Sequence, residues 1–175
     1  KRAPDTSTER LDDEAADGGM SDIMSLHVGP AFALDPQGSV SEIYSPPRIA
    51  PRAEARGFAP GWSLDLTTSG PDGAPWDFSK HECREKARQL IRKTRPLLLV
   101  GSPMCTWFSI LQNLNKGKVD PAEWQKGYDQ AVEHIKFVFE LYDMQVRGGR
   151  YFLHEHPASA SSWQLPAVVE LCSRY

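Results

Sequence analysis

The chain has 175 residues, of which 40% are hydrophobic and 25% are charged, which excludes the fibrous and fully disordered classes. Its 20 basic and 23 acidic side chains give a net charge of −3, without the strongly positive balance of a free-standing nucleic-acid-binding protein. Its three cysteines are too few for a disulfide scaffold, and no apolar run approaches the roughly 20 residues that span a bilayer. We therefore expect free thiols, no membrane span and an intracellular, reducing compartment.

Residues 1–38 differ in composition from the rest of the chain. They are rich in Asp, Glu, Ala, Ser and Gly and show little apolar periodicity, so they cannot bury enough apolar surface to offset the entropy of ordering. We expect a tail or linker here. Its apolar patch from Met20 to Val28 is better explained as a frayed helix, with docking on the domain or on a partner as the alternative. Residues 39–175 form the expected domain. Because the chain begins with Lys1, we expect it to be a processed product or a piece of a longer protein.

Two strand candidates open the domain. Residues 39–45 (SVSEIYS) are strand-like, and Pro46 and Pro47 end them because proline cannot donate a hydrogen bond to a sheet. The second candidate covers residues 62–67 (WSLDLT) and leads into the turn SGPDGAP.

A helix and a buried strand follow. Ser79 and Glu82 have the spacing of a capping box, which predicts a helix over about residues 80–94. Pro96 stops that helix, and residues 97–100 (LLLV) form an unbroken apolar run. Such runs are typical of parallel strands that are covered on both faces, so we expect a central strand.

A longer helix is marked by three start signals. Asp120 is a good N-cap, Pro121 suits the first helical position, and Glu123 suits the third. Apolar residues recur in steps of three and four along one face of this helix: Trp124, Tyr128, Ala131, Ile135, Val138 and Tyr142. Gly148 and Gly149 supply a stop.

A second apolar strand, residues 151–154 (YFLH), follows the long helix, and a further helix is expected within residues 165–174. Strand, helix and strand form a βαβ unit, whose two strands are parallel. The sequence therefore predicts an α/β protein with a partial doubly wound parallel sheet.

Two loops leave the carboxyl ends of these strands, where parallel α/β sheets bind ligands. Residues 101–109 follow the first strand of the unit, and residues 155–159 follow the second. The Cys105 thiol and the Glu155 carboxylate are a candidate nucleophile and acid at the same edge. From spacing alone, a lone cysteine is more often a small buried hydrophobic residue.

The loop GSPMCTWFS resembles the GxPPCxxFS loop of the DNA cytosine-5 methyltransferases, and FLHEHPASASSW resembles their following strand and acidic loop. A closer likeness is to a methyltransferase-like domain in retroelement-type polyproteins of marine protists, where SPPR, DLTT, WDF, GSPxCTxFS and FLHEHPxxASSW occur in this order. The resemblance covers about residues 39–163. It implies a Rossmann-like methyltransferase fold, S-adenosylmethionine as cofactor and nucleic acid as substrate.

The same resemblance implies roles for individual residues. Cys105 would attack C6 of a flipped-out cytosine, Glu155 would hold its N3 edge, and the methyl group would go to C5. Asp65 would hold the ribose hydroxyls of the cofactor and Asp77 its adenine side. Further cofactor contacts would come from Gly101 and Pro103, and substrate contacts from Trp107, Ser109 and His156.

Departures from the family pattern support an alternative function. Met104 replaces the second proline of the cysteine loop, and EIYSPPRIA stands where the family has a glycine-rich FxGxG turn around the cofactor. Proline lacks the amide and the freedom that such a turn uses. The chain also ends at Tyr175, before a target-recognition region. The alternative is a catalytically inactive methyltransferase-like scaffold that binds protein partners through residues 1–38 and an open sheet edge.

Two other groups of residues have ordinary explanations. The histidines and cysteines have poor spacing for a metal site, so none is predicted among His81, Cys83, Cys105, His154, His156 and Cys172. The basic residues from Lys80 to Arg95 are interleaved with Glu82 and Glu85, which favours a solvated helix face over a phosphate-binding one.

Overall fold

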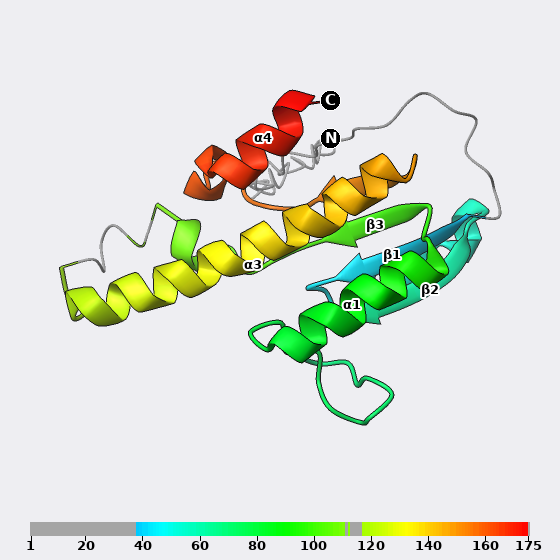
Figure 1. Ribbon diagram of the computed structural model, residues 1–175, viewed down its shortest axis with the longest axis horizontal. Coiled ribbons are helices and arrows are strands. Elements are labelled where there is room, and N and C mark those ends of the chain that lie inside the picture. Colours follow the sequence, from blue (N-terminus) through cyan, green and yellow to red (C-terminus); the bar gives the residue numbers. More distant parts are fainter. Residues whose placement is uncertain (1–37, 111, 113–116, 175) are drawn as a thin grey trace, which may run out of the picture.

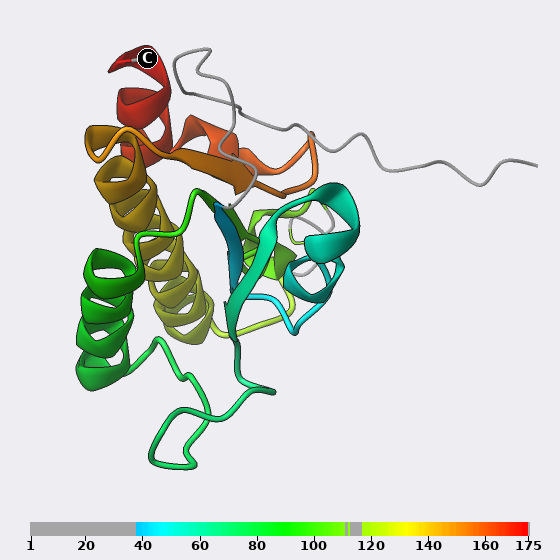
Figure 2. The same cartoon turned by 90° about the vertical axis from the view of Figure 1, so that its right-hand side faces the viewer.

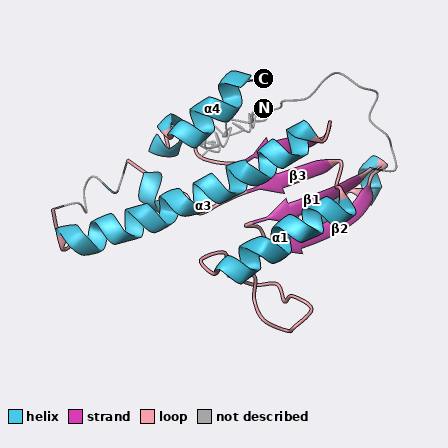
Figure 3. Ribbon diagram, in the orientation of Figure 1, coloured by secondary structure: helices cyan, strands magenta, loops and turns pink. Residues whose placement is uncertain are grey.

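The computed structural model describes residues 38–110, 112 and 117–174, which form an α/β domain around one parallel sheet (Figures 1 and 3). The strands are β1 (Ser39–Ile43), β2 (Ala59–Leu64), β3 (Leu98–Gly101) and β4 (Tyr151–His154). The α-helices are α1 (His81–Thr94), α3 (Pro121–Arg147) and α4 (Pro166–Arg174). The short 3-10 helices are η1 (Ala50–Arg52), η2 (Glu54–Arg56), η3 (Thr106–Phe108) and η4 (Ser161–Gln164). The expected tail, with its apolar patch, lies outside the described residues except for Gly38.

The sheet has the strand order β2-β1-β3-β4, and every neighbouring pair is parallel. The chain runs from β1 outward to β2 and then returns to place β3 on the other side of β1, so the direction of winding reverses between β1 and β3. The main-chain pairing continues beyond the strand ends, where Ser102 N donates to the Ile43 carbonyl (3.2 Å) and Glu155 N to the Gly101 carbonyl (2.9 Å). The predicted α/β class and the βαβ unit of β3, α3 and β4 are confirmed.

Helices α1 and α3 cover one face of the sheet, and η1 and η2 lie on the other (Figure 2). Ile43, Leu99 and Phe152 point toward the helices and join the main core. Val40 and Val100 point the opposite way and pack with the 3-10 segment in a smaller cluster. β3 is therefore central and covered on both faces, as its unbroken apolar run predicts.

Helix α3 begins and ends where the sequence predicts. The Asp120 side chain accepts hydrogen bonds from Ala122 N (2.8 Å) and Glu123 N (3.2 Å), and Pro121 occupies the first turn. The C-cap is Gly148. The apolar face of α3 is buried from Ala131 onward and packs against the sheet. Helix α4 packs against the same helix.

The start of α1 differs from the expectation. Lys80 is the N-cap residue and makes no side-chain cap. The Ser79 hydroxyl instead donates to Asp77 Oδ1 at 2.6 Å, and Ser79 N donates to the same oxygen at 3.0 Å. The predicted capping box is wrong because the Ser79 hydroxyl, which the box requires at the start of the helix, bonds Asp77 in the preceding turn.

Strand β2 begins at Ala59, three residues before the predicted start at Trp62. Its first residues pair with β1 through Ser39 and Val40, and they include Pro60 and Gly61. Both residue types weaken a strand prediction, yet an outer strand tolerates proline because one row of its amides needs no sheet partner.

All three cysteines are free thiols, as predicted. Within the part of the chain that the structure describes, no helix combines the length and apolar character needed to cross a membrane.

Candidate functional site

A cavity of about 290 Å³ opens at the carboxyl ends of β1, β2 and β3, where the winding of the sheet reverses. Open parallel α/β sheets bind their ligands at this position. The volume is at the low end of the range for small-molecule sites. The lining residues are Tyr44, Asp65, Leu66, Trp76, Asp77, Phe78, Ser102, Met104 and His134.

Two aspartates, both singled out in the sequence, line this cavity. Asp65 follows β2, and its Oδ1 accepts from Thr67 N (2.9 Å) and Thr67 Oγ1 (2.7 Å). Asp77 holds Ser79 in the same way, and the hydrogen bond from the Ser79 hydroxyl is the largest cause that lowers the pKa of Asp77. Each turn thus fixes a carboxylate beside the cavity, where it can accept hydrogen bonds from hydroxyl or amino groups of a ligand.

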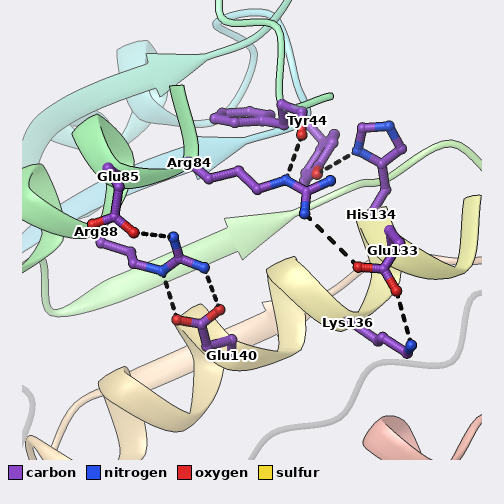
Figure 4. A network of polar contacts seen from close by, with 9 residues as sticks. Tyr44, Arg84, Glu85, Arg88, Glu133, His134, Lys136 and Glu140 are labelled. Atoms are coloured by element: carbon purple, nitrogen blue, oxygen red, sulfur yellow. Dashed lines mark hydrogen bonds and ion pairs between the residues drawn. The ribbon is translucent and has the colours of Figure 1, made fainter. Parts of the chain in front are cut away.

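An aromatic wall with one polar pair closes the cavity on the side of α3. The Tyr44 ring packs on Phe78, with centroids 4.8 Å apart, and the Tyr44 hydroxyl is 2.8 Å from His134 Nδ1 (Figure 4). Burial raises the pKa of Tyr44 far above its usual range. Burial, together with the nearby Arg84 charge, lowers the pKa of His134. Both groups are therefore neutral at pH 7, and this wall offers hydrogen bonding without charge.

The turn after β1 is held by a fully buried carboxylate. Glu42 is 0% exposed, and its Oε1 accepts from the backbone amides of Arg48 (3.0 Å), Ile49 (2.7 Å) and Ala50 (2.6 Å). Its Oε2 accepts from the Ser45 hydroxyl at 2.9 Å. These three amides point at Glu42 and are not available to a ligand, so this turn differs from an anion-binding turn built of free amides.

Cys105 and Glu155 lie at the same edge of the sheet, on loops that leave neighbouring strands. Cys105 is half-buried and immediately precedes η3, where its carbonyl accepts from Phe108 N (2.9 Å). Glu155 is half-buried directly after β4. Neither side chain lines the 290 Å³ cavity, and no hydrogen bond joins the two side chains. Their assignment as a catalytic pair stays a prediction.

Gly101 and Pro103 are buried beneath the loop that carries Cys105, and the residues that alternate with them, Ser102 and Met104, line the cavity. A Cβ atom at Gly101 would lie 2.0 Å from the Tyr142 hydroxyl oxygen of α3. Gly101 therefore permits the close packing of β3 on α3. Neither Gly101 nor Pro103 lines the cavity, and their assignment as cofactor contacts stays a prediction.

A second cavity of about 400 Å³ lies beyond η3 and contains two of the three predicted substrate residues. Trp107 packs so closely on α3 that a Cβ atom at Gly127 would lie 2.2 Å from its Cζ2 atom. Its ring also meets Trp124 edge-on, with centroids 6.0 Å apart. The lining residues are Trp107, Phe108, Ser109, Ile110, Gln112, Trp124, Gln125, Tyr128, Ser159 and Ser161.

His156, the third predicted substrate residue, is 1% exposed and lines neither cavity. Its Nδ1 is 3.1 Å from the Ser162 hydroxyl, and burial lowers its pKa to about 4. His154 is buried on the other side of Glu155, with its Nδ1 3.1 Å from the Tyr142 hydroxyl, and burial lowers its pKa to about 3. The two neutral imidazoles anchor the loop that presents Glu155. Among the described residues, no group of three or more His, Cys, Asp or Glu side chains is placed to hold a metal ion.

Sequence reasoning missed the polar pair of the cavity wall. Tyr44 and His134 are 90 positions apart, and only the packing of α3 against the end of β1 joins them. One signal was present, because His134 follows Ala131 by three positions and precedes Val138 by four, at the border of the apolar stripe.

Comparisons with known proteins do not add to this geometry. No family model matches the chain, and neither the curated proteins nor the solved structures gave a match. Function is therefore inferred from the fold and from the side chains of the site.

Proposed function

We propose that this chain is a Rossmann-like, methyltransferase-like domain that binds S-adenosylmethionine at the carboxyl edge of its sheet. The observation that carries the proposal is the cavity at the reversal of winding between β1 and β3, with Asp65 and Asp77 fixed beside it. The resemblance of the two loops to cytosine-5 methyltransferases supports the choice of cofactor, because both loops leave the same edge.

The residues of the cavity fit the nucleoside part of that cofactor. Ribose hydroxyls and the adenine amino group are hydrogen-bond donors, and Asp65 and Asp77 are acceptors. Trp76 and Phe78 offer flat apolar surface for a purine ring. About 290 Å³ matches a nucleoside better than a larger dinucleotide. When bound, S-adenosylmethionine supplies a methyl group for transfer.

Cys105 and Glu155 are proposed to act on a pyrimidine next to this cofactor. The Cys105 thiolate supplies the electron pair for a bond to C6 of cytosine, and a proton held by Glu155 at N3 neutralises the charge that the ring gains. Later elimination transfers the C5 proton to water, re-forms the C5–C6 double bond and breaks the sulfur–carbon bond, whose electron pair returns to sulfur. A thiolate suits both steps, because it is a good nucleophile and a good leaving group.

Calorimetric titration of S-adenosylmethionine and S-adenosylhomocysteine into the purified chain tests the proposal. We expect saturable binding in the micromolar range, about −8 kcal/mol. Asp65→Asn and Asp77→Asn should each weaken binding at least tenfold, because each removes a charged acceptor. The control Asp129→Asn removes an exposed aspartate of α3 outside the cavity and should leave binding unchanged. Absence of heat from a chain shown to be folded by circular dichroism would refute cofactor binding.

A second candidate function is the catalytically inactive scaffold, and the Glu42 contacts favour it. The amides of Arg48, Ile49 and Ala50 are occupied by a carboxylate of the chain itself. In addition, β2 and β4 are the outer strands of the described sheet, and each presents an edge to a partner strand. The same titration separates the two functions, because a scaffold has no need of the cofactor.

A further inference from the structure

The net charge of the chain conceals an uneven distribution. Residues 1–37 contain three basic and eight acidic side chains, a balance of −5, so residues 38–175 carry +2 of the total of −3. Three cations of α1, Arg84, Lys86 and Arg88, are neutralised by carboxylates on the same helix, on α3 and on the preceding turn. Arg84 approaches Glu133, and Arg88 bonds both Glu85 and Glu140 (Figure 4). Arg92 and Lys93, at the C-terminal end of α1, form no ion pair with a described residue, and a second group of unpaired cations lies on the opposite face of the sheet.

Three arginines on the segment after β1 form what we call the arginine surface: Arg48, Arg52 and Arg56. All three are exposed, and none forms an ion pair with a described residue. Glu54 is the single acidic residue between Arg48 and Arg56. An unpaired guanidinium group keeps all of its donors for a partner, and its planar fork matches the geometry of phosphate.

The segment that carries the arginine surface is fixed at both ends. Glu42 binds the amides of residues 48–50 from inside the sheet, as described above. The buried side chains Ala50 and Ala53 are three positions apart, so one side of η1 and η2 packs on the sheet. Gly57, with φ of 81°, ends the segment in a left-handed conformation. The arginines therefore project from a backbone that is already ordered.

The arginine surface begins at the edge of the sheet where the cavities open. Arg48 follows the carboxyl end of β1, and η1 and η2 then continue across the face opposite α1 and α3 (Figure 2). The same edge exposes large apolar side chains, at fractions from 44% to 63%, on the loops that follow β1, β2, β3 and η3. They are Ile49, Leu66, Met104 and Ile110. A positively charged stretch next to scattered apolar surface suits a polyanion that also has apolar faces.

We infer that the arginine surface binds the phosphates of a single-stranded nucleic acid, whose unstacked bases contact the apolar loops at the carboxyl edge. This inference rests on the proposed function, since it names the part of the chain that holds the substrate beside Cys105. A single strand fits better than a duplex, because its bases are free to meet apolar side chains whereas those of a duplex are stacked and paired.

Fluorescence anisotropy with a labelled single strand of about 20 nucleotides, titrated at several salt concentrations, tests the inference. The variant R48Q/R52Q/R56Q should weaken binding at least tenfold. It should also reduce the slope of log affinity against log salt by about 2, since each lost phosphate contact in a single strand contributes about 0.7.

The matched control is R92Q/K93Q/R95Q, which removes the same charge from exposed, unpaired residues at the C-terminal end of α1, near the opposite edge of the sheet. It should leave the slope unchanged. Equal losses in both triple variants, or no binding of the unaltered chain at low salt, would overturn the inference. Tighter binding of the matching duplex than of the single strand would overturn it as well.

The cofactor titration keeps this test separate from that of the proposed function. The arginine variant should bind S-adenosylmethionine as the unaltered chain does, because none of its substitutions touches the cavity lining. If the unaltered chain binds the single strand but not S-adenosylmethionine, the proposed function is wrong and the arginine surface stands. If it binds S-adenosylmethionine but the arginine variant binds the single strand as tightly as the unaltered chain, the inference is wrong and the proposed function stands.

Discussion

Glu42 shows how one buried side chain determines the shape of a loop. A carboxylate in a central strand has no path to water, so its burial is unfavourable unless donors surround it. The chain supplies those donors within eight residues, from three backbone amides and one hydroxyl. The carboxylate therefore ties down the proline-containing turn after β1, which begins with Tyr44 in a left-handed conformation (φ of 56°).

Replacement of Glu42 should destabilise the fold strongly. Glu42→Gln keeps the size of the side chain but turns one acceptor oxygen into a donor that faces other donors. We expect a loss of about 2 to 3 kcal/mol in the free energy of unfolding, measured by urea denaturation. Glu54→Gln, at an exposed position of the same segment, should change stability by less than about 0.5 kcal/mol. Similar losses in both variants would show that the buried contacts are not the cause.

The two buried histidines that flank Glu155 make stability depend on pH. The unfolded chain binds a proton on each imidazole below about pH 6.5, whereas the folded chain does so only below about 3 for His154 and about 4 for His156. Between pH 6.5 and 4 the unfolded state therefore binds more protons, so stability falls as the pH falls. We expect a loss of about 2 to 3 kcal/mol between pH 6 and 5 in urea titrations.

Substitution separates this effect from other titrations. His156→Gln removes one of these groups and should reduce the loss between pH 6 and 5 by roughly a third to a half, whatever its effect at pH 7, because burial also lowers the pKa of His134. His81→Gln, at an exposed position at the start of α1, should leave the pH dependence as it is. An unchanged slope in His156→Gln would rule out the buried imidazole as its source.

Among the secondary-structure elements, the contact of β3 with α3 depends on a missing side chain. The backbone of Gly101 approaches the Tyr142 hydroxyl and Val138, both on a helix whose inner face is fully buried. Gly101→Ala should therefore cost about 3 kcal/mol, because neither neighbour has room to move. Gly117→Ala, where nothing lies within 4 Å of the new methyl group, should cost less than about 0.5 kcal/mol. Thermal unfolding of the two variants compares them directly.

The elements differ in how well the sequence predicts them. Helix α3 and strand β4 match their predicted bounds because local signals agree: a cap, a proline, a continuous apolar stripe and a glycine stop. β2 is displaced by three residues because its pairing with β1 outweighs the poor strand propensity of Pro60 and Gly61. Ser79 fails as a cap because Asp77, two residues earlier, competes for its hydroxyl. Local rules thus hold until a neighbouring element or turn uses the same group.

The residues of the candidate site also divide into those that the sequence predicts and those that it does not. Asp65 and Asp77 are brought to one cavity, as their assignment to a common cofactor requires. Trp107 is found against Gly127 of α3, which its position beside Cys105 does not reveal. The pairing of Tyr44 with His134 depends on the approach of segments far apart in the chain, and no local pattern encodes it.

At the scale of the whole molecule, strand order places the cavity and the start of the arginine surface at the same edge of the sheet. The reversal of winding opens a cavity at the carboxyl edge, and the connection from β1 to β2 leaves the same edge with its arginines. The α-helices do not belong to that connection. η1 and η2 cover the opposite face of the sheet with short side chains. Cofactor cavity and cysteine loop therefore share the carboxyl edge, and the arginine surface leaves that edge at Arg48 and runs across the sheet toward the amino ends of the strands.

The strand order also has a consequence for synthesis on the ribosome. Val40 of β1 pairs with Leu98 of β3, so a central strand is made 58 residues before its neighbour. At about 5 to 20 residues per second, β1 waits about 3 to 12 s beside β2 with one edge unpaired. Nascent chains arrested after residue 97 should therefore be digested rapidly by protease, whereas chains arrested well beyond residue 175 should resist. Equal resistance at both lengths would mean that β1 and β2 are stable without β3. If the shorter chains are digested first, β1 is an exposed edge strand during those seconds, although it is central in the finished sheet. A chaperone can bind that edge.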